Sequence, residues 1–335
     1  MSRAMSSAPI LVTGAAGFIG ARFVESCNQR GTPVVSVDLR VHFEERGEFS
    51  GLDFGPIVDR KELFQWLRDT QPEIAAIVHL GACSSTTETR LDYLNEVNVE
   101  FSKRLFEWAT EQRVPMVYAS SAATYGDGRV GFEDDESRIP KLQPLNPYGR
   151  SKQEFDLWVL EREREGKTPP SWAGFKFFNV YGFGERHKGA QASVVVHAFD
   201  QIESTGRVRL FRSHRDDFAD GEQSRDFIFV GDVIEVLHFA LAAPIPRGIF
   251  NLGSGKARSF LDLTRAVFSA LGRTEAIDWI DTPEAIRDNY QYFTEASMRR
   301  LHDEGWDSSA TELEEGVRRT VERLLAASGA ATETS

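Results

Sequence analysis

Two side chains four residues apart could form an acid/base pair: Tyr148 and Lys152, in the run NPYGRSK. On a helix this spacing places both side chains on one face. A free tyrosine titrates at about 10, too high for a base at neutral pH, but a lysine cation beside it favours the phenolate. Ser121, in the run YASSAATYG, could hydrogen-bond a substrate oxygen, and its neighbour Ser120 is the weaker candidate. Together these groups could take a proton from an alcohol while hydride leaves its carbon.

A second possible acid/base lies in the stretch ERHKGAQASV, which contains Arg186, His187 and Lys188. The stretch follows the apolar run FFNVYG and precedes small residues that lead into a predicted helix. One of these cations could work in a pocket, where desolvation or nearby cations lower the pKa of a lysine. The alternative is a solvated loop, and residue types alone leave both interpretations open.

A glycine-rich turn, TGAAGFIG, predicts a dinucleotide site. Its Gly14, Gly17 and Gly20 stand between a predicted strand and a predicted helix. There they permit a tight turn, let the backbone approach a pyrophosphate and pack helix against strand, while the helix N-terminus attracts negative charge. Asp38, at the end of the next strand, would bond an adenosine ribose, whereas Arg40 would meet a 2′-phosphate. These two residues therefore favour different nicotinamide cofactors.

Five short apolar runs predict strands that alternate with helices in the first half of the chain. The predicted helices cover 18–30, 91–112 and 147–165, and the strands lie in PILVTG, TPVVSVD, AAIVHLGA, VPMVYAS and WAGFKFFNVYG. Strands this apolar, separated by helices, indicate a parallel sheet covered on both faces. The predicted fold class is α/β, a Rossmann-type doubly wound parallel sheet with a smaller C-terminal α/β substrate domain.

The second half is less regular and supplies the smaller domain. Helices are predicted over 193–204, 259–271 and 313–326, with extended runs in VRLF, RDFIFVGDV and GIFNLGSG and a polar surface loop over 212–225. The expected dinucleotide-binding domain comprises 8–182 together with segments near 225–255. The expected substrate-binding domain comprises 183–224 and 256–328, and we expect 1–7 and 329–335 to be disordered.

The bulk composition argues against several classes of protein. The 335 residues are 41% hydrophobic and 27% charged, a globular mixture. A net charge of −12 argues against a nucleic-acid partner, because phosphate contacts need clustered cations. No apolar run approaches a membrane span and the N-terminus lacks the apolar core of a signal peptide, so we expect a cytoplasmic protein without a membrane partner. Two cysteines make no disulfide framework, and seven scattered histidines without H-E-x-x-H predict no metal.

The G-x-x-G-x-x-G spacing, followed by a Tyr-x-x-x-Lys pair, resembles the extended short-chain dehydrogenase/reductase family. In that family, which includes NAD-dependent epimerases and dehydratases, a nicotinamide cofactor lies across the carboxyl ends of the strands. Its dehydratases carry an Asp-Glu pair after the serine, where this chain has Ala122 and Ala123, and this argues against dehydration. The closer resemblance, over roughly residues 10–326, is to the ADP-L-glycero-D-manno-heptose 6-epimerases. It rests on HLGACSSTTE, YASSAATYG, FNVYG, HKGAQASV, RDFIFVGDV, GIFNLGSG and YQYFTEA, which occur in this order.

That resemblance implies a reaction without net redox change. It implies epimerisation at carbon 6 of ADP-D-glycero-D-manno-heptose, by oxidation to a 6-keto sugar and return of hydride to the opposite face, for lipopolysaccharide core biosynthesis. It implies Tyr148 as one acid/base and Lys188 as the second, with Ser121 and Lys152 completing the catalytic set. The implied cofactor is NADP, with NAD as the other candidate. The implied partners are a small nucleotide-sugar substrate and further copies of the chain, in a homo-oligomer such as a pentamer.

Other site residues carry over from the family motif by motif. The implied cofactor contacts are Gly14, Gly17, Phe18, Ile19, Gly20, Asp38, Leu39, Arg40, Arg60, Leu80, Gly81, Ala82, Cys83, Ser84, Asn98, Lys152, Val180 and Lys188. The implied substrate contacts are Ser121, Asn179, Ala190, His197, Phe211, Arg212, Ser213, His214, Arg225 and Tyr290. Among these, the fork of Arg225 suits a diphosphate. His197 could instead be a half-buried helical histidine, and Tyr290 a packing residue.

The chain departs from the family at three places. Leu80 replaces a glutamate before GACSS, and RSH at 212–214 replaces a small Glu-Gly-Ser stretch and is followed by a longer loop. The family's lysines after the second strand are replaced by RVHFEERGEF. A 2′-phosphate would therefore have to be held by Arg40 or Arg60.

Two other functions fit the same sequence. The altered 212–225 loop also allows an epimerase or reductase that acts on another nucleotide sugar. A catalytically inactive NAD(P)-sensing regulator could keep the fold, but a sensor needs no base, and Ser121, Tyr148 and Lys152 are all present. Bound cofactor without turnover would favour the regulator.

Overall fold

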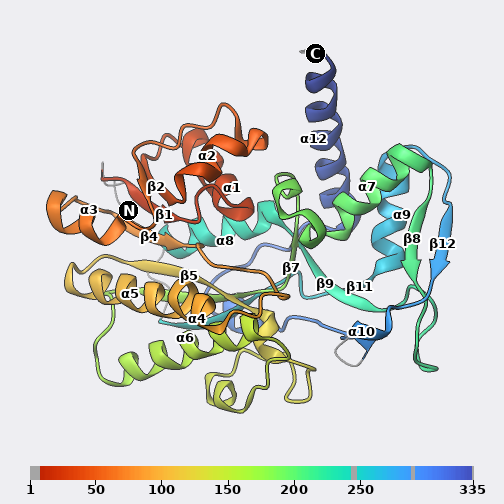
Figure 1. Ribbon diagram of the computed structural model, residues 1–335. Coiled ribbons are helices and arrows are strands. Elements are labelled where there is room, and N and C mark those ends of the chain that lie inside the picture. The colour runs from red at the N-terminus through yellow and green to blue at the C-terminus, as the bar shows by residue number, and fades with distance from the viewer. Residues whose placement is uncertain (1–7, 243–246, 288–290, 334–335) are drawn as a thin grey trace.

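The computed structural model describes residues 8–242, 247–287 and 291–333. Figure 1 shows a wide sheet with helices on both faces, beside a smaller lobe formed largely by the C-terminal half of the chain. Within those three ranges, none of the helices combines the length and the apolar character needed to cross a membrane.

Among the described residues, the wide sheet has seven strands, and every neighbouring pair is parallel. The order is β10-β6-β5-β4-β1-β2-β3, so the chain returns from β3 at one edge to place β4 beside β1. This confirms the predicted α/β class with a doubly wound, Rossmann-type parallel sheet. The strands are β1 (Ile10–Thr13), β2 (Val34–Asp38), β3 (Ile57–Asp59), β4 (Ala76–His79), β5 (Met116–Ser121), β6 (Trp172–Phe177) and β10 (Gly248–Leu252).

Helices cover both faces of this sheet because successive side chains of each strand point into different cores. Ile10 and Val12 face the core that α1 and α8 close, whereas Leu11 faces the core that α3, α5 and α6 close. Central strands are buried on both faces, which explains why their sequences are continuous apolar runs. These helices are α1 (Phe18–Gln29), α3 (Leu63–Thr70), α5 (Phe101–Glu111), α6 (Pro147–Arg164) and α8 (Val230–Ala242), with the short α2 (Arg40–Glu45) after β2.

The smaller lobe has its own core between three helices and two short sheets. Parallel strands β8 and β12 form one sheet, and β9 pairs with both β7 and β11 in the other. The strands are β7 (Asn179–Tyr181), β8 (Val208–Phe211), β9 (Ser224–Phe229), β11 (Ala257–Ser259) and β12 (Ile277–Ile280). The helices are α7 (Val194–Thr205), α9 (Phe260–Ala270) and α12 (Leu313–Glu333), with the short α10 (Glu284–Arg287) and α11 (Arg299–Asp303).

The predicted fifth strand, WAGFKFFNVYG, is two strands in the structure. The chain leaves the wide sheet after Phe177, and β7 pairs with β9 in the three-stranded sheet. An apolar run cannot reveal this change of partner, because both strands are equally suited to burial. The short β3 and α3, which were not predicted, complete the edge of the wide sheet beside β2.

Two predicted helices also differ in detail. The helix expected over 91–112 is α4 (Leu91–Leu94), a π-helical turn η2 (Asn95–Glu100) and then α5. A π-helical turn widens the backbone by one residue and is frequent at functional sites. At the C-terminus, α12 continues to Glu333, where a disordered tail over 329–335 was predicted. Residues 1–7, also predicted to be disordered, lie outside the described residues.

Candidate active site

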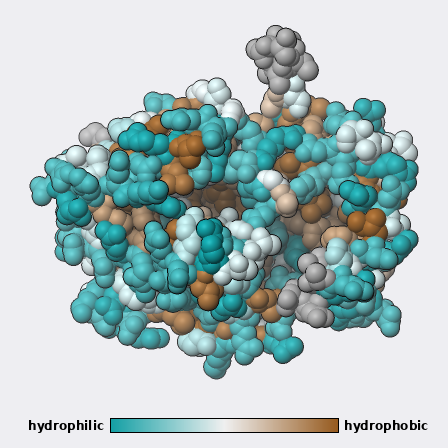
Figure 2. All heavy atoms as spheres, viewed as in Figure 1, coloured by the Kyte–Doolittle hydropathy of each residue, from teal (hydrophilic) through white to brown (hydrophobic). Residues whose placement is uncertain are grey.

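A cavity of about 570 Å³ lies at the carboxyl ends of β1, β2, β4 and β5. Figure 2 shows the surface of the molecule hollowed near the centre of the same view. The strand order reverses between β1 and β4, and ligands of doubly wound sheets bind outside the sheet at such a switch point. The topology therefore brings the glycine turn and the ends of four strands to one place.

The glycine turn between β1 and α1 leaves no room for side chains at Gly14 and Gly20. Gly14 has a φ of 68°, and a Cβ built on it would lie 2.7 Å from the amide nitrogen of Gly81. A Cβ on Gly20 would lie 2.0 Å from the carbonyl oxygen of Gly14. Helix α1 starts at Phe18, and its N-cap, Gly17, has no side chain to cover the first-turn N–H groups. This cradle fits a dinucleotide pyrophosphate.

Asp38 stands at the end of β2, on the side of the cavity where an adenosine ribose would lie. One of its carboxylate oxygens accepts the N–H of Ala16 at 3.2 Å. The other accepts the N–H of Leu39 at 2.8 Å and lies 2.8 Å from Nδ1 of His42. The carboxylate is thus fixed against the glycine turn, in an orientation suited to ribose hydroxyls.

Of the two arginines expected to meet a 2′-phosphate, Arg60 borders the cavity and Arg40 does not. Arg40 does not border the cavity, and its guanidinium lies 3.9 Å from the carboxylate of Glu62 at the surface. Arg60 does border the cavity, together with Arg46, whose guanidinium donates to the carbonyl oxygen of Ala16. Burial lowers the pKa of Arg46, and the charge of Asp38 opposes that shift. Arg46 and Arg60, rather than Arg40, are therefore the arginines that could meet a 2′-phosphate.

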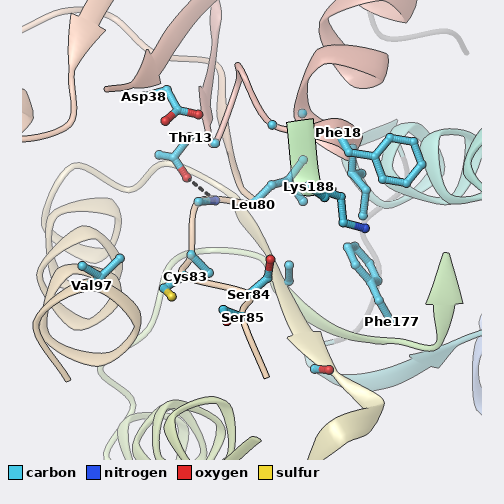
Figure 3. A pocket seen from close by; sticks show the side chains of 18 of the residues that line it. Thr13, Phe18, Asp38, Leu80, Cys83, Ser84, Ser85, Val97, Phe177 and Lys188 are labelled. Atoms are coloured by element: carbon cyan, nitrogen blue, oxygen red, sulfur yellow. Dashed lines mark hydrogen bonds between the residues drawn. The ribbon is translucent and has the colours of Figure 1, made fainter. Parts of the chain in front are cut away.

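The segment after β4 crosses the middle of the cavity, and Figure 3 shows Leu80, Cys83, Ser84 and Ser85 along it. The amide of Gly81 donates to the hydroxyl of Thr13 at 3.1 Å. Asn98, in the π-helical turn, is fully buried and does not border the cavity. Its side chain instead accepts from the amide of Cys83 at 2.8 Å and donates to the carbonyl of Cys83 at 3.0 Å. Asn98 therefore holds the segment that would contact a cofactor.

Ser121, Tyr148 and Lys152 all border the cavity. Helix α6 begins at Pro147, and Asn146 caps it by accepting the amide of Gly149 at 2.8 Å, which places Tyr148 in the first turn. Lys152 lies one turn later, and its Nζ donates to the carbonyl of Ala119 at 2.8 Å. Ser120 also borders the cavity, but its hydroxyl donates to the buried carboxylate of Asp156 at 2.7 Å, which favours Ser121 as the substrate-facing serine.

Burial shifts the acid/base chemistry of this group. It lowers the pKa of Lys152 to about 8, and the negative charge of Asp156 opposes the shift. Burial raises the pKa of Tyr148, while a hydrogen bond with Ser121 acts in the other direction. A positive charge bound in the cavity would favour the phenolate further, because an opposite charge nearby stabilises the ionised form.

Of the three basic residues in ERHKG, Lys188 is the one that presents a charge to the cavity. Arg186 is exposed and pairs with Asp200 at 2.8 Å. Burial, together with Arg46 and Lys188, lowers the pKa of His187 to about 4, so this ring is neutral at pH 7. The Nζ of Lys188 lies 3.0 Å from the buried carboxylate of Glu185, and Figure 3 shows its side chain between Phe18 and Phe177.

Among the described residues that the resemblance implies as substrate contacts, only Ser121 borders this cavity. Asn179 and Ala190 are exposed, and His197 is half-buried on α7. The guanidinium of the buried Arg225 donates to the carbonyls of Ser224 and Gln291. The remaining described members are Phe211 at the end of β8 and Arg212, Ser213 and His214 in the loop after it, and Tyr290 lies outside the described residues.

Several residues at the cavity were not singled out from the sequence. His42 and Arg46 are the most informative, because His42 follows Asp38 by four positions and Arg46 follows His42 by four. Treating RVHFEE as helical would have given His42 a different direction from Arg40, whereas Arg46 lies just after that helix. Gln191 also borders the cavity and donates to the hydroxyl of Ser85 at 2.8 Å, which ties the ERHKG segment to the segment after β4.

The chain is similar to known proteins over most of its length. The model of the NAD dependent epimerase/dehydratase family matches residues 10–253. The ADP-L-glycero-D-manno-heptose-6-epimerase of Nitratidesulfovibrio vulgaris (strain Hildenborough) is 46% identical over 320 residues, which is 95% of this chain and 98% of the relative.

Two solved structures extend this similarity. The ADP-L-glycero-D-manno-heptose-6-epimerase of Helicobacter pylori is 25% identical with a TM-score of 0.81, over 97% of this chain and 99% of that one. The UDP-glucose 4-epimerase of Thermus thermophilus, solved with NAD, is 25% identical with a TM-score of 0.74, over 95% and 99% of the two chains. The chain therefore belongs to the NAD dependent epimerase/dehydratase family and, within it, to the ADP-L-glycero-D-manno-heptose-6-epimerases.

Proposed function

We propose that this protein converts ADP-D-glycero-D-manno-heptose to ADP-L-glycero-D-manno-heptose, for lipopolysaccharide core biosynthesis. The observation that carries the proposal is that two acid/base groups, Tyr148 and Lys188, border one cavity from different elements. A single base would suffice for a dehydrogenase, whereas inversion at one carbon needs proton transfer for both epimers. The names of the relatives supply the substrate.

The cofactor is a nicotinamide dinucleotide, whose pyrophosphate the cradle at Gly14 and the N-terminus of α1 would hold. A bound nicotinamide would supply reversible hydride transfer at carbon 6 of the sugar. Tyr148 takes the hydroxyl proton of one epimer, and the cation of Lys152 stabilises the phenolate. Ser121 hydrogen-bonds the reacting oxygen and steadies it as a carbonyl forms.

Lys188 performs the same proton transfer for the other epimer, which presents its hydroxyl in the other orientation. Its Nζ donates to Glu185, whose carboxylate also accepts the amides of Gly182 at 3.1 Å and Ser193 at 3.0 Å. The amine is therefore held near the cavity by a fixed acceptor while 26% of the side chain stays accessible.

The direct test is to incubate the purified protein with NADP and ADP-D-glycero-D-manno-heptose and to resolve the two carbon-6 epimers by chromatography or NMR. We expect the L-glycero epimer to accumulate to equilibrium without net formation of NADPH. Net reduction of cofactor would instead indicate a dehydrogenase, and turnover of another nucleotide sugar alone would favour the second candidate substrate class. Tight cofactor binding without any turnover would favour the regulator.

We propose NADP as the physiological cofactor, with the 2′-phosphate met by Arg46, Arg60 and His42. These three cationic or basic side chains border the cavity on the side of Asp38. Phosphate carries more charge than a ribose hydroxyl, so clustered donors of this kind discriminate in favour of the phosphorylated cofactor.

The Arg46→Ala variant is expected to weaken NADP binding by roughly tenfold to a hundredfold, the effect of losing one charge-assisted hydrogen bond, and to leave NAD binding within about threefold. Calorimetric titration of the protein with each cofactor measures both. Arg40→Ala is the matched control, because that arginine lies outside the cavity, and it should alter neither affinity. Tenfold tighter binding of NAD by the unmodified protein would contradict the NADP assignment.

We also propose a cytoplasmic homo-oligomer, consistent with a nucleotide-sugar substrate. Size-exclusion chromatography with light scattering distinguishes a pentamer from smaller assemblies.

A further inference from the structure

A buried ion pair lies directly behind the catalytic groups. The side chains of Asp156 in α6 and Lys176 in β6 are both fully inaccessible to solvent, and Nζ of Lys176 lies 2.8 Å from the carboxylate of Asp156. The same carboxylate accepts the hydroxyl of Ser120 at 2.7 Å and that of Tyr118 at 3.1 Å. One acid of α6 thus receives donors from both β5 and β6.

This pair is linked to the main chain of the catalytic serine. The ammonium of Lys176 donates to the hydroxyl of Thr124 at 2.7 Å, in the turn η3 (Ala122–Tyr125). The hydroxyl of Thr124 in turn donates to the carbonyl of Ser121 at 2.8 Å. Nearby at the end of β5, the hydroxyl of Ser120 donates to Asp156, and the carbonyl of Ala119 accepts a hydrogen bond from Nζ of Lys152.

Asp156 also lies on the helix that carries both other catalytic groups. It follows Lys152 by four residues and Tyr148 by eight, so all three share one face of α6. Burial lowers the pKa of Lys152 and raises that of Tyr148; the negative charge of Asp156 opposes the first shift and adds to the second. The ion pair is therefore coupled to the site by hydrogen bonds and by charge.

Stability alone does not account for such a pair. Taking two charges out of water carries a desolvation penalty, and buried ion pairs are often replaced by apolar residues without loss of stability. The chain nevertheless buries two full charges in the layer next to the cavity, where Ser120, Tyr118 and Thr124 are hydrogen-bonded to them. A function for the charges themselves explains this arrangement.

We propose that Asp156 and Lys176 are positioning residues that fix Ser121 against Tyr148 and balance the electrostatic potential in which Tyr148 and Lys152 exchange protons. The pair acts through those groups and touches no substrate. This inference rests on the proposed function for the role of Tyr148 as a base, and it assigns the buried pair a part in that reaction.

Other titratable groups also face this region, and they remain constant in the test below. The thiol of Cys83 lies in the segment after β4, and the imidazole of His79, which is neutral at pH 7, lies in β4. The turns around η3 and η4 (Glu136–Lys141) contribute the phenol of Tyr125 and the carboxylates of Asp134 and Glu136.

The test uses two variants that break the same contact and change the local charge in opposite directions. Asp156→Asn removes a negative charge, so the potential becomes more positive and protons leave the Tyr148–Lys152 pair at lower pH. Lys176→Met removes a positive charge, so protons leave at higher pH. We expect the apparent pKa of Tyr148 to move by at least about half a pH unit in each direction.

The measurement is an ultraviolet titration of tyrosinate in each background, minus the same background with Tyr148→Phe. This readout isolates the phenol of Tyr148 and needs no turnover. The acid limb of kcat/KM for epimerisation should move in the same two directions. Shifts of the same sign, or no shift in folded variants, would overturn the proposal, since a merely structural contact would lower activity equally in both.

Lys176→Met could fail to fold because it leaves a carboxylate buried without its cation. If it does not fold, Asp156→Asn is compared with the double variant Asp156→Asn/Lys176→Met, because neither protein then contains a buried carboxylate without its cation. The second substitution should return the pKa of Tyr148 toward the unmodified value.

If the protein shows these shifts but no epimerase activity, the proposed function fails and the proposed role of the ion pair stands. If it epimerises the substrate while the pKa of Tyr148 stays unshifted, the proposed function stands and the proposed role of the ion pair fails.

Discussion

The Tyr148→Phe variant is expected to lose epimerase activity by about 10²–10⁴-fold, the usual contribution of a positioned acid/base group. The substitution removes one oxygen from a side chain that borders the cavity in the first turn of α6, beside Ser121 and Lys152. Without that oxygen the proposed acceptor for the proton of the substrate alcohol is lost. Epimer ratios measured by NMR over time give the rate.

Cofactor binding separates this loss from general damage. Tyr148→Phe should bind NADP within about threefold of the unmodified protein, because the glycine cradle and Asp38 lie on other elements. Tyr181→Phe is the matched control: its hydroxyl donates to the carbonyl of Leu313 at 3.4 Å in the interior of the smaller lobe, away from the cavity. Near-normal epimerisation by Tyr148→Phe would exclude this tyrosine as the base.

The Lys188→Met variant is expected to lower epimerisation by about 10²–10³-fold in both directions. Oxidation of a single epimer should survive, because Tyr148 is intact and serves that epimer alone. Single-turnover reactions, started from each epimer separately, detect the burst of reduced cofactor. We expect a normal burst from one epimer and a strongly slowed one from the other, and equal bursts together with normal epimerisation would contradict the two-base mechanism.

Stability must be controlled in this variant, since Lys188 is the cation beside the buried Glu185. Loss of a hydrogen bond to a charged group costs about 1.5–3 kcal/mol, although Glu185 keeps two backbone donors. Glu185→Gln/Lys188→Met removes both charges and should recover most of the lost stability while epimerisation stays low. Lys167→Met, at a side chain that is 67% exposed, should leave activity and thermal midpoint unchanged.

The loop that contains Lys188 shows where sequence reasoning reaches its limit. ERHKG offers three basic residues, and only their environments separate them: Arg186 is paired at the surface, His187 is neutral, and Lys188 borders the cavity. These environments arise from contacts of Arg186 with Asp200, of His187 with Phe49 and of Lys188 with Glu185. The spacing of residues along the chain does not indicate which of these contacts forms. The role of Lys188 therefore came from a family resemblance.

The cations near Asp38 give a second case. Arg40 lies closest in sequence to Asp38 and was predicted to meet a 2′-phosphate, but helix α2 starts at that residue and turns its side chain toward Glu62. His42, in the same short helix, lies beside Asp38, and Arg46, directly after the helix, borders the cavity. Nearness along the chain was a poor guide because a helix directs adjacent side chains to different faces.

The sequence by itself determined the class of fold, the cofactor cradle and the Tyr148–Lys152 pair. Each depends on local physics: apolar runs that must be buried, glycines where a Cβ would collide, and a helical spacing that puts two side chains on one face. The tertiary structure alone decided which cations reach the cavity, that Asn98 supports the segment after β4, and that Asp156 pairs with Lys176 behind Ser121. Those outcomes depend on contacts between segments distant in the chain, and these contacts form only when the strands assemble into the sheet and the helices pack on its two faces.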